Sequence, residues 1–238
     1  MKYSFEKLSD TIEICISDEH RFGTDAFLLA DFSRPKHKDN VCDLCSGSGI
    51  VALLMKRNSQ PKSILAVEIQ ESAVSLIEKS IEKSLLTGLT PLCADLREIS
   101  RLPSHGEFDL VTCNPPYKID NTGAKNENEA SSIARHEVLC TADDVCKAAS
   151  KLLKPGGRLC LCNRPERLCD VIISMKKYKL EPKRLRFVSK NPSSQPWLFL
   201  IEGKKGAKPF LQVEKPLFIQ GENGFSDELK KIYGNGVK

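Results

Sequence analysis

The sequence has no hydrophobic run long enough to cross a membrane and no internal repeat. Its apolar runs fall short of the roughly 18–20 residues that a transmembrane helix needs. The opening segment, MKYSFEKLSDTIE, is too polar to form the apolar core of a signal peptide. These absences argue against a membrane-spanning or repeat protein. They favour a cytoplasmic globular protein, and 238 residues are enough for one large domain.

A complete set of zinc ligands is also missing. Cys42 and Cys45 form a CxxC pair, but no second pair and no close pair of histidines accompanies it, whereas a structural zinc site needs four ligands. Most of the ten cysteines stand in apolar segments, such as VCDLC (41–45) and RLCLC (158–162). There a free cysteine behaves as a small buried hydrophobe. We therefore expect reduced thiols in the core and no metal.

Charge is unevenly spread along the chain. Residues 1–150 hold 17 Lys and Arg against 23 Asp and Glu, a net charge of −6, whereas residues 151–238 hold 19 against 8, a net charge of +11. A strongly basic half is typical of a protein that binds a polyanion such as nucleic acid. Lysines that merely keep a surface soluble would produce the same count, so charge alone leaves both interpretations open.

The sequence does contain a regular alternation of short apolar segments and amphipathic ones. The segments predicted as strands are 40–45, 63–69, 89–95, 108–114, 158–163, 183–190 and 196–205, and those predicted as helices are 49–57, 70–86, 141–153 and 164–178. Such alternation predicts βαβ units and a parallel sheet covered on both faces. Thr141 is the expected N-cap of its helix, and KPGG (154–157) is expected to end it.

The predicted fold class is therefore α/β: a Rossmann-like, seven-stranded, mostly parallel sheet with helices on both faces and the last strand antiparallel. No helix is expected between the final two strands, which should form an antiparallel pair. We expect a single domain over residues 1–238. It would comprise an N-terminal extension (1–39), a catalytic core (40–203) and a basic C-terminal tail (204–238).

In open α/β sheets the ligand lies beyond the carboxyl ends of the strands, so the residues after each predicted strand are candidates for a site. The first strand runs into DLCSGSGIVALL (43–54), where Gly47 and Gly49 allow the backbone to approach a ligand and the next helix offers free N–H groups. Glycine turns are common, and this one departs from the GxGxxG dinucleotide fingerprint.

Acidic residues follow the next two strands. Glu68 can accept hydrogen bonds from both hydroxyls of a ribose. Asp95 can accept one from the amino group of an adenine. Each could instead cap the segment that follows it, because aspartate and glutamate also accept bonds from free N–H groups at a helix start.

The fourth strand ends in NPPY (114–117), which by itself could be a rigid turn. However, it is the fourth strand end in a row whose residues could face a ligand, and this position favours a functional site over a simple turn. The side chain of Asn114 and the carbonyl of Pro115 are acceptors that could hold both N–H groups of a planar amine. Pro116 fixes the backbone. Tyr117 could stack on a base, a contact worth about 1–3 kcal/mol, once that base is flipped out of its strand.

This order of motifs resembles the class I S-adenosylmethionine-dependent methyltransferases, and NPPY is similar to the (D/N/S)PP(Y/F/W) signature of members that methylate planar amino groups. The resemblance implies S-adenosylmethionine as cofactor. It also implies catalytic roles for Asn114, Pro115, Pro116 and Tyr117. The implied cofactor-binding residues are Gly23, Thr24, Asp25, Asp43, Cys45, Gly47, Gly49, Glu68, Ile69, Asp95, Leu96 and Asn114. Cys45 stands where the usual glycine triplet has its first member.

Nearly the whole chain resembles one bacterial branch, the tRNA1(Val) (adenine(37)-N(6))-methyltransferases. The segments that carry this resemblance are RFGTDAFLLADF (21–32), SSIARHEVLC (131–140) and NRPERL (163–168). It implies methylation of N(6) of adenosine 37 in a valine tRNA. It also places Gly23, Thr24 and Asp25 near the methionine end of the cofactor, although Thr24 or Asp25 could cap the following helix. The residues expected to contact the RNA are Tyr117, Arg135, Lys183, Arg184, Arg186, Lys204 and Lys205.

Other functions remain open. A protein glutamine methyltransferase acting on release factors also uses NPPY, but it carries an extra helical domain for which Asp43 comes too early. A DNA adenine methyltransferase is a second alternative, but nothing here resembles a target-recognition domain, whereas a ribosomal RNA substrate stays open. A non-catalytic RNA-binding module would keep the fold and the charge without needing Asn114 or Tyr117.

Overall fold

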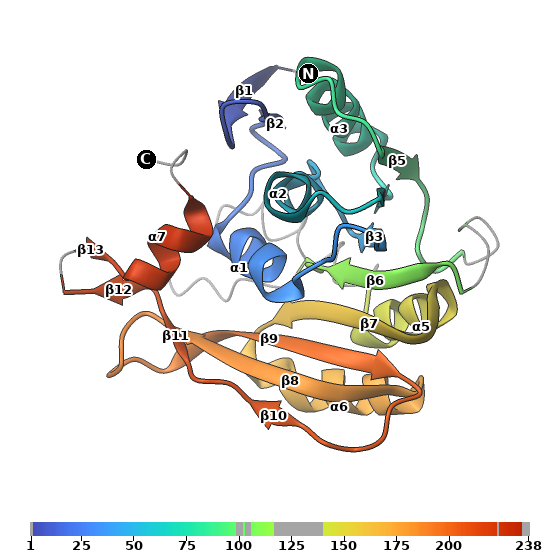
Figure 1. The fold of residues 1–238 in the computed structure, drawn as a ribbon, viewed down its shortest axis with the longest axis vertical. Coiled ribbons are helices and arrows are strands. Elements are labelled where there is room, and N and C mark those ends of the chain that lie inside the picture. The colour runs from blue at the N-terminus through green and yellow to red at the C-terminus, as the bar shows by residue number, and fades with distance from the viewer. Residues whose placement is uncertain (1, 99–101, 103–105, 117–139, 223, 235–238) are drawn as a thin grey trace, which may run out of the picture.

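The computed structural model of the chain describes residues 2–98, 102, 106–116, 140–222 and 224–234. Among these residues, nine strands form one central sheet in the order β10-β8-β9-β7-β6-β3-β4-β5, with β11 also paired to β8 (Figure 1). Their bounds are β3 Asn40–Leu44, β4 Ser63–Glu68, β5 Leu89–Cys93, β6 Phe108–Cys113, β7 Leu153–Asn163, β8 Leu180–Ser189, β9 Pro196–Lys205, β10 Gln212–Val213 and β11 Leu217–Phe218.

Most strand pairs in the sheet are parallel. Strand β3 pairs in parallel with β4 and β6, and the parallel set continues to β5 on one side and β7 on the other. Strand β9 is antiparallel to both β7 and β8. The α/β class, the seven predicted strands and the antiparallel closing strand are confirmed, and the two-residue strands β10 and β11 add to one edge.

Helices cover both faces of this sheet. Their bounds are α1 Thr24–Ser33, α2 Ile50–Ser59, α3 Glu71–Lys83, α5 Ala142–Leu152, α6 Leu168–Lys177 and α7 Asp227–Tyr233, with a 3₁₀ helix at Pro165–Arg167. One hydrophobic cluster joins α1, α2, α3 and α7 to one face, and a second joins α5 and α6 to the other. The central strands are apolar on both sides because both of their faces are buried.

KPGG (154–157) follows the end of helix α5, as expected, and lies inside strand β7. Helix α5 begins as expected, with Thr141 as N-cap in a reciprocal capping box with Asp144. It ends at Leu152, because Pro155 disfavours a helical conformation in the residue before it. Strand β7 then starts directly at Leu153. The register of β6 with β7 shifts between Phe108 and Leu110, which leaves residues 154–157 of β7 without a partner in β6.

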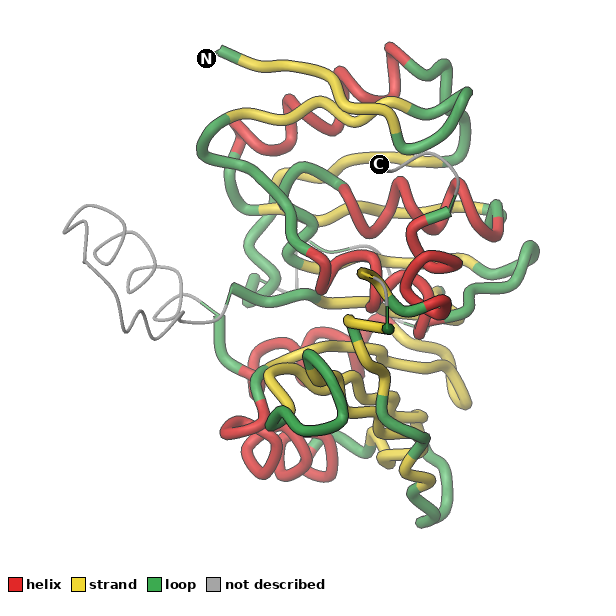
Figure 2. The backbone as a smooth tube through the Cα atoms, turned by 90° about the vertical axis from the view of Figure 1, so that its left-hand side faces the viewer, coloured by secondary structure: helices red, strands yellow, loops and turns green. Residues whose placement is uncertain are grey.

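Two antiparallel strands, β1 (Tyr3–Lys7) and β2 (Glu13–Ser17), lie at the opposite end of the molecule from β8 (Figure 1; Figure 2). The described residues after β9, 206–222 and 224–234, fold back onto the domain. Helix α7 packs against α1 through Tyr233, whose hydroxyl lies 2.7 Å from Thr24 Oγ1. A small pair, β12 (Gln220–Gly221) and β13 (Gly224–Phe225), precedes that helix. Within the described residues, no helix has the length and apolarity to span a membrane.

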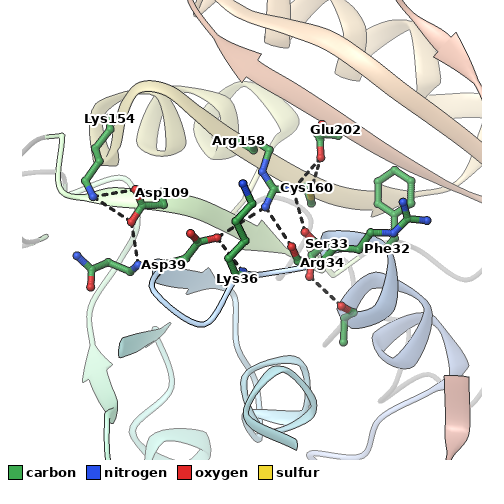
Figure 3. A network of polar contacts seen from close by, with 12 residues as sticks. Phe32, Ser33, Arg34, Lys36, Asp39, Asp109, Lys154, Arg158, Cys160 and Glu202 are labelled. Carbon is green, nitrogen blue, oxygen red and sulfur yellow. Dashed lines mark hydrogen bonds and ion pairs between the residues drawn. The ribbon is translucent and has the colours of Figure 1, made fainter. Parts of the chain in front are cut away.

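The C-terminal end of α1 is fastened to the sheet by a network of arginines around Glu202 (Figure 3). Arg158 donates to Glu202 at 2.9 Å and to the carbonyl of Ser33 at 2.9 Å. Arg184 donates to Glu202 at 2.9 Å and to the carbonyl of Phe32 at 2.8 Å. These carbonyls lack partners within the helix, and cations are favoured at a helix C-terminus. The network therefore fixes the position of α1 relative to β7, β8 and β9.

We predict that Glu202→Ala lowers the free energy of unfolding by about 3–5 kcal/mol, because two largely buried guanidinium groups would lose their shared carboxylate. Urea unfolding measures this change. The matched control is Asp18→Ala, whose pair with Arg21 is exposed (82% and 71% of the side chains) and should contribute less than about 1 kcal/mol. Equal losses in the two variants would contradict the anchoring role of Glu202.

Candidate active site

A cavity of about 270 Å³ opens at the carboxyl ends of β3, β4, β5 and β6, near the small end of the range for ligand pockets. The sheet brings seven of the cofactor-binding residues expected from the sequence to its wall: Cys45, Gly47, Glu68, Ile69, Asp95, Leu96 and Asn114. Pro116 also lines it. Parallel strands that end at the same level explain why residues far apart in the chain meet here.

The turn between β3 and α2 passes through the left-handed backbone region three times. The φ angles are 55° at Cys45, 55° at Gly47 and 85° at Gly49. A side chain at Gly49 would also lie 3.0 Å from Ile77, whereas one at Gly47 would meet nothing within 4 Å. A cysteine at the first of these positions costs about 1–2 kcal/mol relative to glycine, which explains why glycine is usual there.

The thiol of Cys45 lies 3.7 Å from that of Cys140, and both residues line the cavity. A hydrogen bond with Cys113 and burial raise the pKa of the Cys45 thiol well above its ordinary value. Burial likewise raises the pKa of Cys113 to about 12. All ten cysteines lie in the described part of the chain and are free. Because a protonated thiol is a poor nucleophile and a poor metal ligand, the raised pKa values favour a packing role for Cys45 and Cys113.

Asp43 lies beneath the cavity rather than on its wall. Its carboxylate is buried and accepts hydrogen bonds from Ser46 Oγ and Thr112 Oγ1, both at 2.6 Å. It therefore ties the glycine turn to the neighbouring strand β6. Burial raises its pKa to about 6, although the two hydrogen bonds oppose the shift.

Glu68 caps backbone groups and also lines the cavity, so the structure combines the two roles that the sequence left open. Its Oε1 accepts from the amides of Ile69 and Gln70 at 2.9 and 3.0 Å, at the start of α3. Its Oε2 accepts from the amide of Gly47 at 2.9 Å. One carboxylate thus joins β4, the glycine turn and α3.

Asp95 also has a local partner. Its carboxylate accepts from the backbone amide of Arg97 at 2.8 Å and pairs with the Arg97 guanidinium at 2.6 Å. That hydrogen-bonded pair holds the pKa of Asp95 below its ordinary value. The residue is therefore an anionic acceptor at the cavity wall.

Asn114, the first residue of NPPY, is held from two sides. Its Nδ2 donates to Asp25 Oδ2 at 2.7 Å, and its Oδ1 accepts from the Cys162 thiol at 3.0 Å. Asp25 belongs to the first turn of α1, and Cys162 lies at the carboxyl end of β7. Sequence reasoning missed Cys162 because a cysteine in an apolar strand reads as core. Cys162 lies near the carboxyl end of β7, which neighbours β6, and this position could have predicted that Cys162 lies close to Asn114.

Helix α1 has Gly23 as its N-cap, with no side-chain capping bond. The alternative that Thr24 or Asp25 caps this helix is therefore wrong. Thr24 bonds to Tyr233 instead, and a side chain at position 23 would lie 2.5 Å from the Asp25 carboxylate. The absence of a side chain at Gly23 thus leaves room for the Asp25 carboxylate in its present position.

Tyr117, Arg135 and the segment 118–137 lie outside the described residues. The basic residues are described, and several are engaged within the protein: Arg184 pairs with Glu202 and Glu214, Arg186 pairs with Glu228, and Lys205 donates to the carbonyl of Leu153. Strand register places Lys183, Lys204 and Lys205 at the amino-terminal edge of the parallel strands, opposite the cavity.

No group of three or more His, Cys, Asp or Glu that could hold a metal occurs among the described residues.

The fold and this cavity define an S-adenosylmethionine-dependent methyltransferase. The methyltransferase small domain is matched over residues 17–177, and the chain belongs to that family.

Two curated relatives are named tRNA1(Val) (adenine(37)-N6)-methyltransferase. The one from Photobacterium profundum is 28% identical over 182 residues, covering 75% of each chain. The one from Shewanella sediminis is 26% identical over 219 residues, covering 88% of each chain.

Solved structures show the same fold at low identity. A "predicted O-methyltransferase", protein Atu636 from Agrobacterium tumefaciens, has a TM-score of 0.71 and 18% identity, with coverage of 88% of this chain and 95% of that one. M. jannaschii TYW2 in complex with AdoMet has a TM-score of 0.58 and 13% identity, with coverage of 85% of both.

We predict a pH-dependent stability term from Asp43. Its pKa in the folded chain, about 6, lies above the ordinary value of 3.8, so its contribution is full below about pH 4 and is lost as pH rises through 6. In urea unfolding, the stability of the wild type relative to Asp43→Asn should fall by about 1 kcal/mol from pH 5 to pH 8. The exposed Asp18→Asn serves as control. A difference between wild type and Asp43→Asn that does not vary with pH would refute the assignment.

Proposed function

We propose that this protein methylates N(6) of an adenosine in tRNA, and that adenosine 37 of a valine tRNA is the target. The observation that carries the proposal is the placement of Asn114 at the cavity wall, with its amide oriented by Asp25. The names of the two relatives supply the substrate.

The described residues fit S-adenosylmethionine. Glu68 Oε2 has lone-pair capacity left for a ribose hydroxyl, since among the described residues it accepts one hydrogen bond, from the Gly47 amide. Ile69 and Leu96 offer apolar walls for a flat base, and Asp95 offers an anionic acceptor for its amino edge. The open space over Gly47 allows close approach to the backbone. When bound, the cofactor supplies an electrophilic methyl group on a sulfonium.

The target amine needs help because the lone pair of an adenine amino group is delocalised into the ring. Asn114 Oδ1 and the carbonyl of the next residue, Pro115, are two acceptors that would bind its two N–H groups. Holding both of them orients the nitrogen and favours the pyramidal geometry in which its lone pair is available. The same pair of acceptors would suit a glutamine amide, so release factor remains the alternative substrate.

The substrate RNA should approach the edge of the sheet where the cavity opens. Strand register places Lys190 and Trp197 beside the β8–β9 turn at that edge, and Arg167 follows β7 there. Lys190 and Arg167 are exposed, and Trp197 is 38% exposed. We therefore move the proposed RNA contacts from Lys183, Arg184, Arg186, Lys204 and Lys205 to these residues. A tRNA substrate also implies a cytoplasmic location.

The first test is transfer of labelled methyl groups from S-adenosylmethionine to tRNA, ribosomal RNA, DNA and release factor. We expect label in tRNA, and nucleoside mass spectrometry should identify it as N(6)-methyladenosine. Asn114→Ala should reduce turnover by at least about 100-fold while leaving cofactor affinity nearly unchanged. Label in release factor alone, or full activity in Asn114→Ala, would overturn the proposal. Cofactor binding without transfer to any acceptor would favour a non-catalytic module.

The second test separates the two edges of the sheet. Affinity for tRNA should fall steeply with salt, and Lys190→Ala should reduce the slope of log affinity against log salt by about 1. Trp197→Ala should weaken binding by about 1–3 kcal/mol with the slope unchanged. Lys204→Ala removes the same charge at the opposite edge and should have no effect. Equal effects of Lys190→Ala and Lys204→Ala, or binding insensitive to salt, would contradict the proposed surface.

A further inference from the structure

The orientation of the Asn114 side-chain amide is decided by its two neighbours. The oxygen and nitrogen of an amide have nearly the same shape, so hydrogen-bond partners determine which way the group points. Asp25 is a carboxylate and can only accept, and it lies 2.7 Å from Nδ2. Cys162 donates its thiol proton to Oδ1 at 3.0 Å. The two contacts agree on a single orientation.

That orientation matters for an amine substrate. With Nδ2 toward Asp25, Asn114 presents an acceptor oxygen; with the amide flipped, it would present a donor to the N–H groups of the amine. A hydrogen bond to a carboxylate is stronger than one between neutral groups. It also polarises the amide, which makes Oδ1 a better acceptor as positive charge develops on the amine.

We propose that Asp25 is a positioning residue for methyl transfer: it holds the Asn114 amide so that Oδ1 faces the amine. This inference rests on the proposed function of the cavity. It gives Asp25 a role toward Asn114, whereas the family resemblance implied only proximity to the cofactor.

The fold supplies the rigidity that such a role needs. Helix α1 is fixed at its C-terminus by Arg158 and Arg184 and at its N-terminus by the bond of Thr24 to Tyr233. Gly23 has no side chain and so leaves room for the Asp25 carboxylate beside it. A side chain supported in this way can hold a partner within the tolerance that a catalytic site demands.

The test exchanges the two side chains. Asn114→Asp alone would place two carboxylates at hydrogen-bond distance, where they repel unless they share a proton. Asp25→Asn alone leaves two amides, whose contact no longer decides which atom of the Asn114 amide faces residue 25; of the two orienting contacts, the Cys162 bond alone is kept. The double variant Asp25→Asn/Asn114→Asp restores one amide, one carboxylate and the hydrogen bond between them. The (D/N/S)PP(Y/F/W) signature shows that aspartate is compatible with this position in similar enzymes.

We expect Asp25→Asn to lower kcat by about 100-fold with little change in cofactor affinity. Asn114→Asp should be nearly inactive at about pH 8 and should gain activity as pH falls, because a shared proton removes the repulsion. The double variant should exceed both single variants by at least about tenfold at that pH. Asp31→Asn, the same charge change at the other end of α1, should keep kcat within about twofold.

Three results would overturn the role: wild-type kcat in Asp25→Asn, a double variant no better than the worse single one, or no pH dependence in Asn114→Asp. The amine methylated by the wild type is the substrate throughout, so an RNA target other than tRNA would refute the proposed function without affecting this inference.

A second measurement tests the same role without turnover. The ¹⁵N–¹H resonances of the Asn114 amide in the wild type should show one hydrogen-bonded proton protected from exchange. Rapid exchange of both protons would also refute the role.

Discussion

The candidate site depends on the register of three neighbouring parallel strands. Leu44 of β3 is level with Val67 of β4 and with Cys113 of β6, so the residues that follow these strands reach one edge together. A slip of one residue would turn every side chain of a strand to the other face. The buried apolar residues on both faces of the sheet prevent such a slip. The packing that keeps this register therefore also fixes where Glu68 and Asn114 lie.

A second element, α1, completes the site from outside the parallel sheet. Its last turn is bonded to strands of the sheet through Arg158 and Arg184, and its first turn reaches Asn114 through Asp25. The segment between these ends is buried in the same hydrophobic cluster as α2. The buried ion pairs around Glu202 therefore serve the geometry of the site as well as stability, although they lie away from the cavity.

Local patterns in the sequence were enough to predict the strands, the helices and the strand ends with their polar residues. They could not predict contacts set by tertiary packing. Asp25 and Asn114 are 89 positions apart, and nothing near either residue signals their bond. The surplus of lysine and arginine after residue 150 is present, but a count of charges along the chain does not say at which edge of the sheet they lie. The strand register places Lys204 and Lys190 at opposite edges of the sheet. Arg184 is paired with the carboxylate of Glu202.

The central claim is that Asn114 and Pro115 bind the amine that receives the methyl group. The most direct measurement is a crystal structure of the protein with S-adenosylhomocysteine and an RNA that it methylates. Our account predicts the target nitrogen within about 3.2 Å of both Asn114 Oδ1 and the Pro115 carbonyl, with the Asp25 contact kept. A target amine bound elsewhere, or one that faces the amide nitrogen of Asn114, would contradict it.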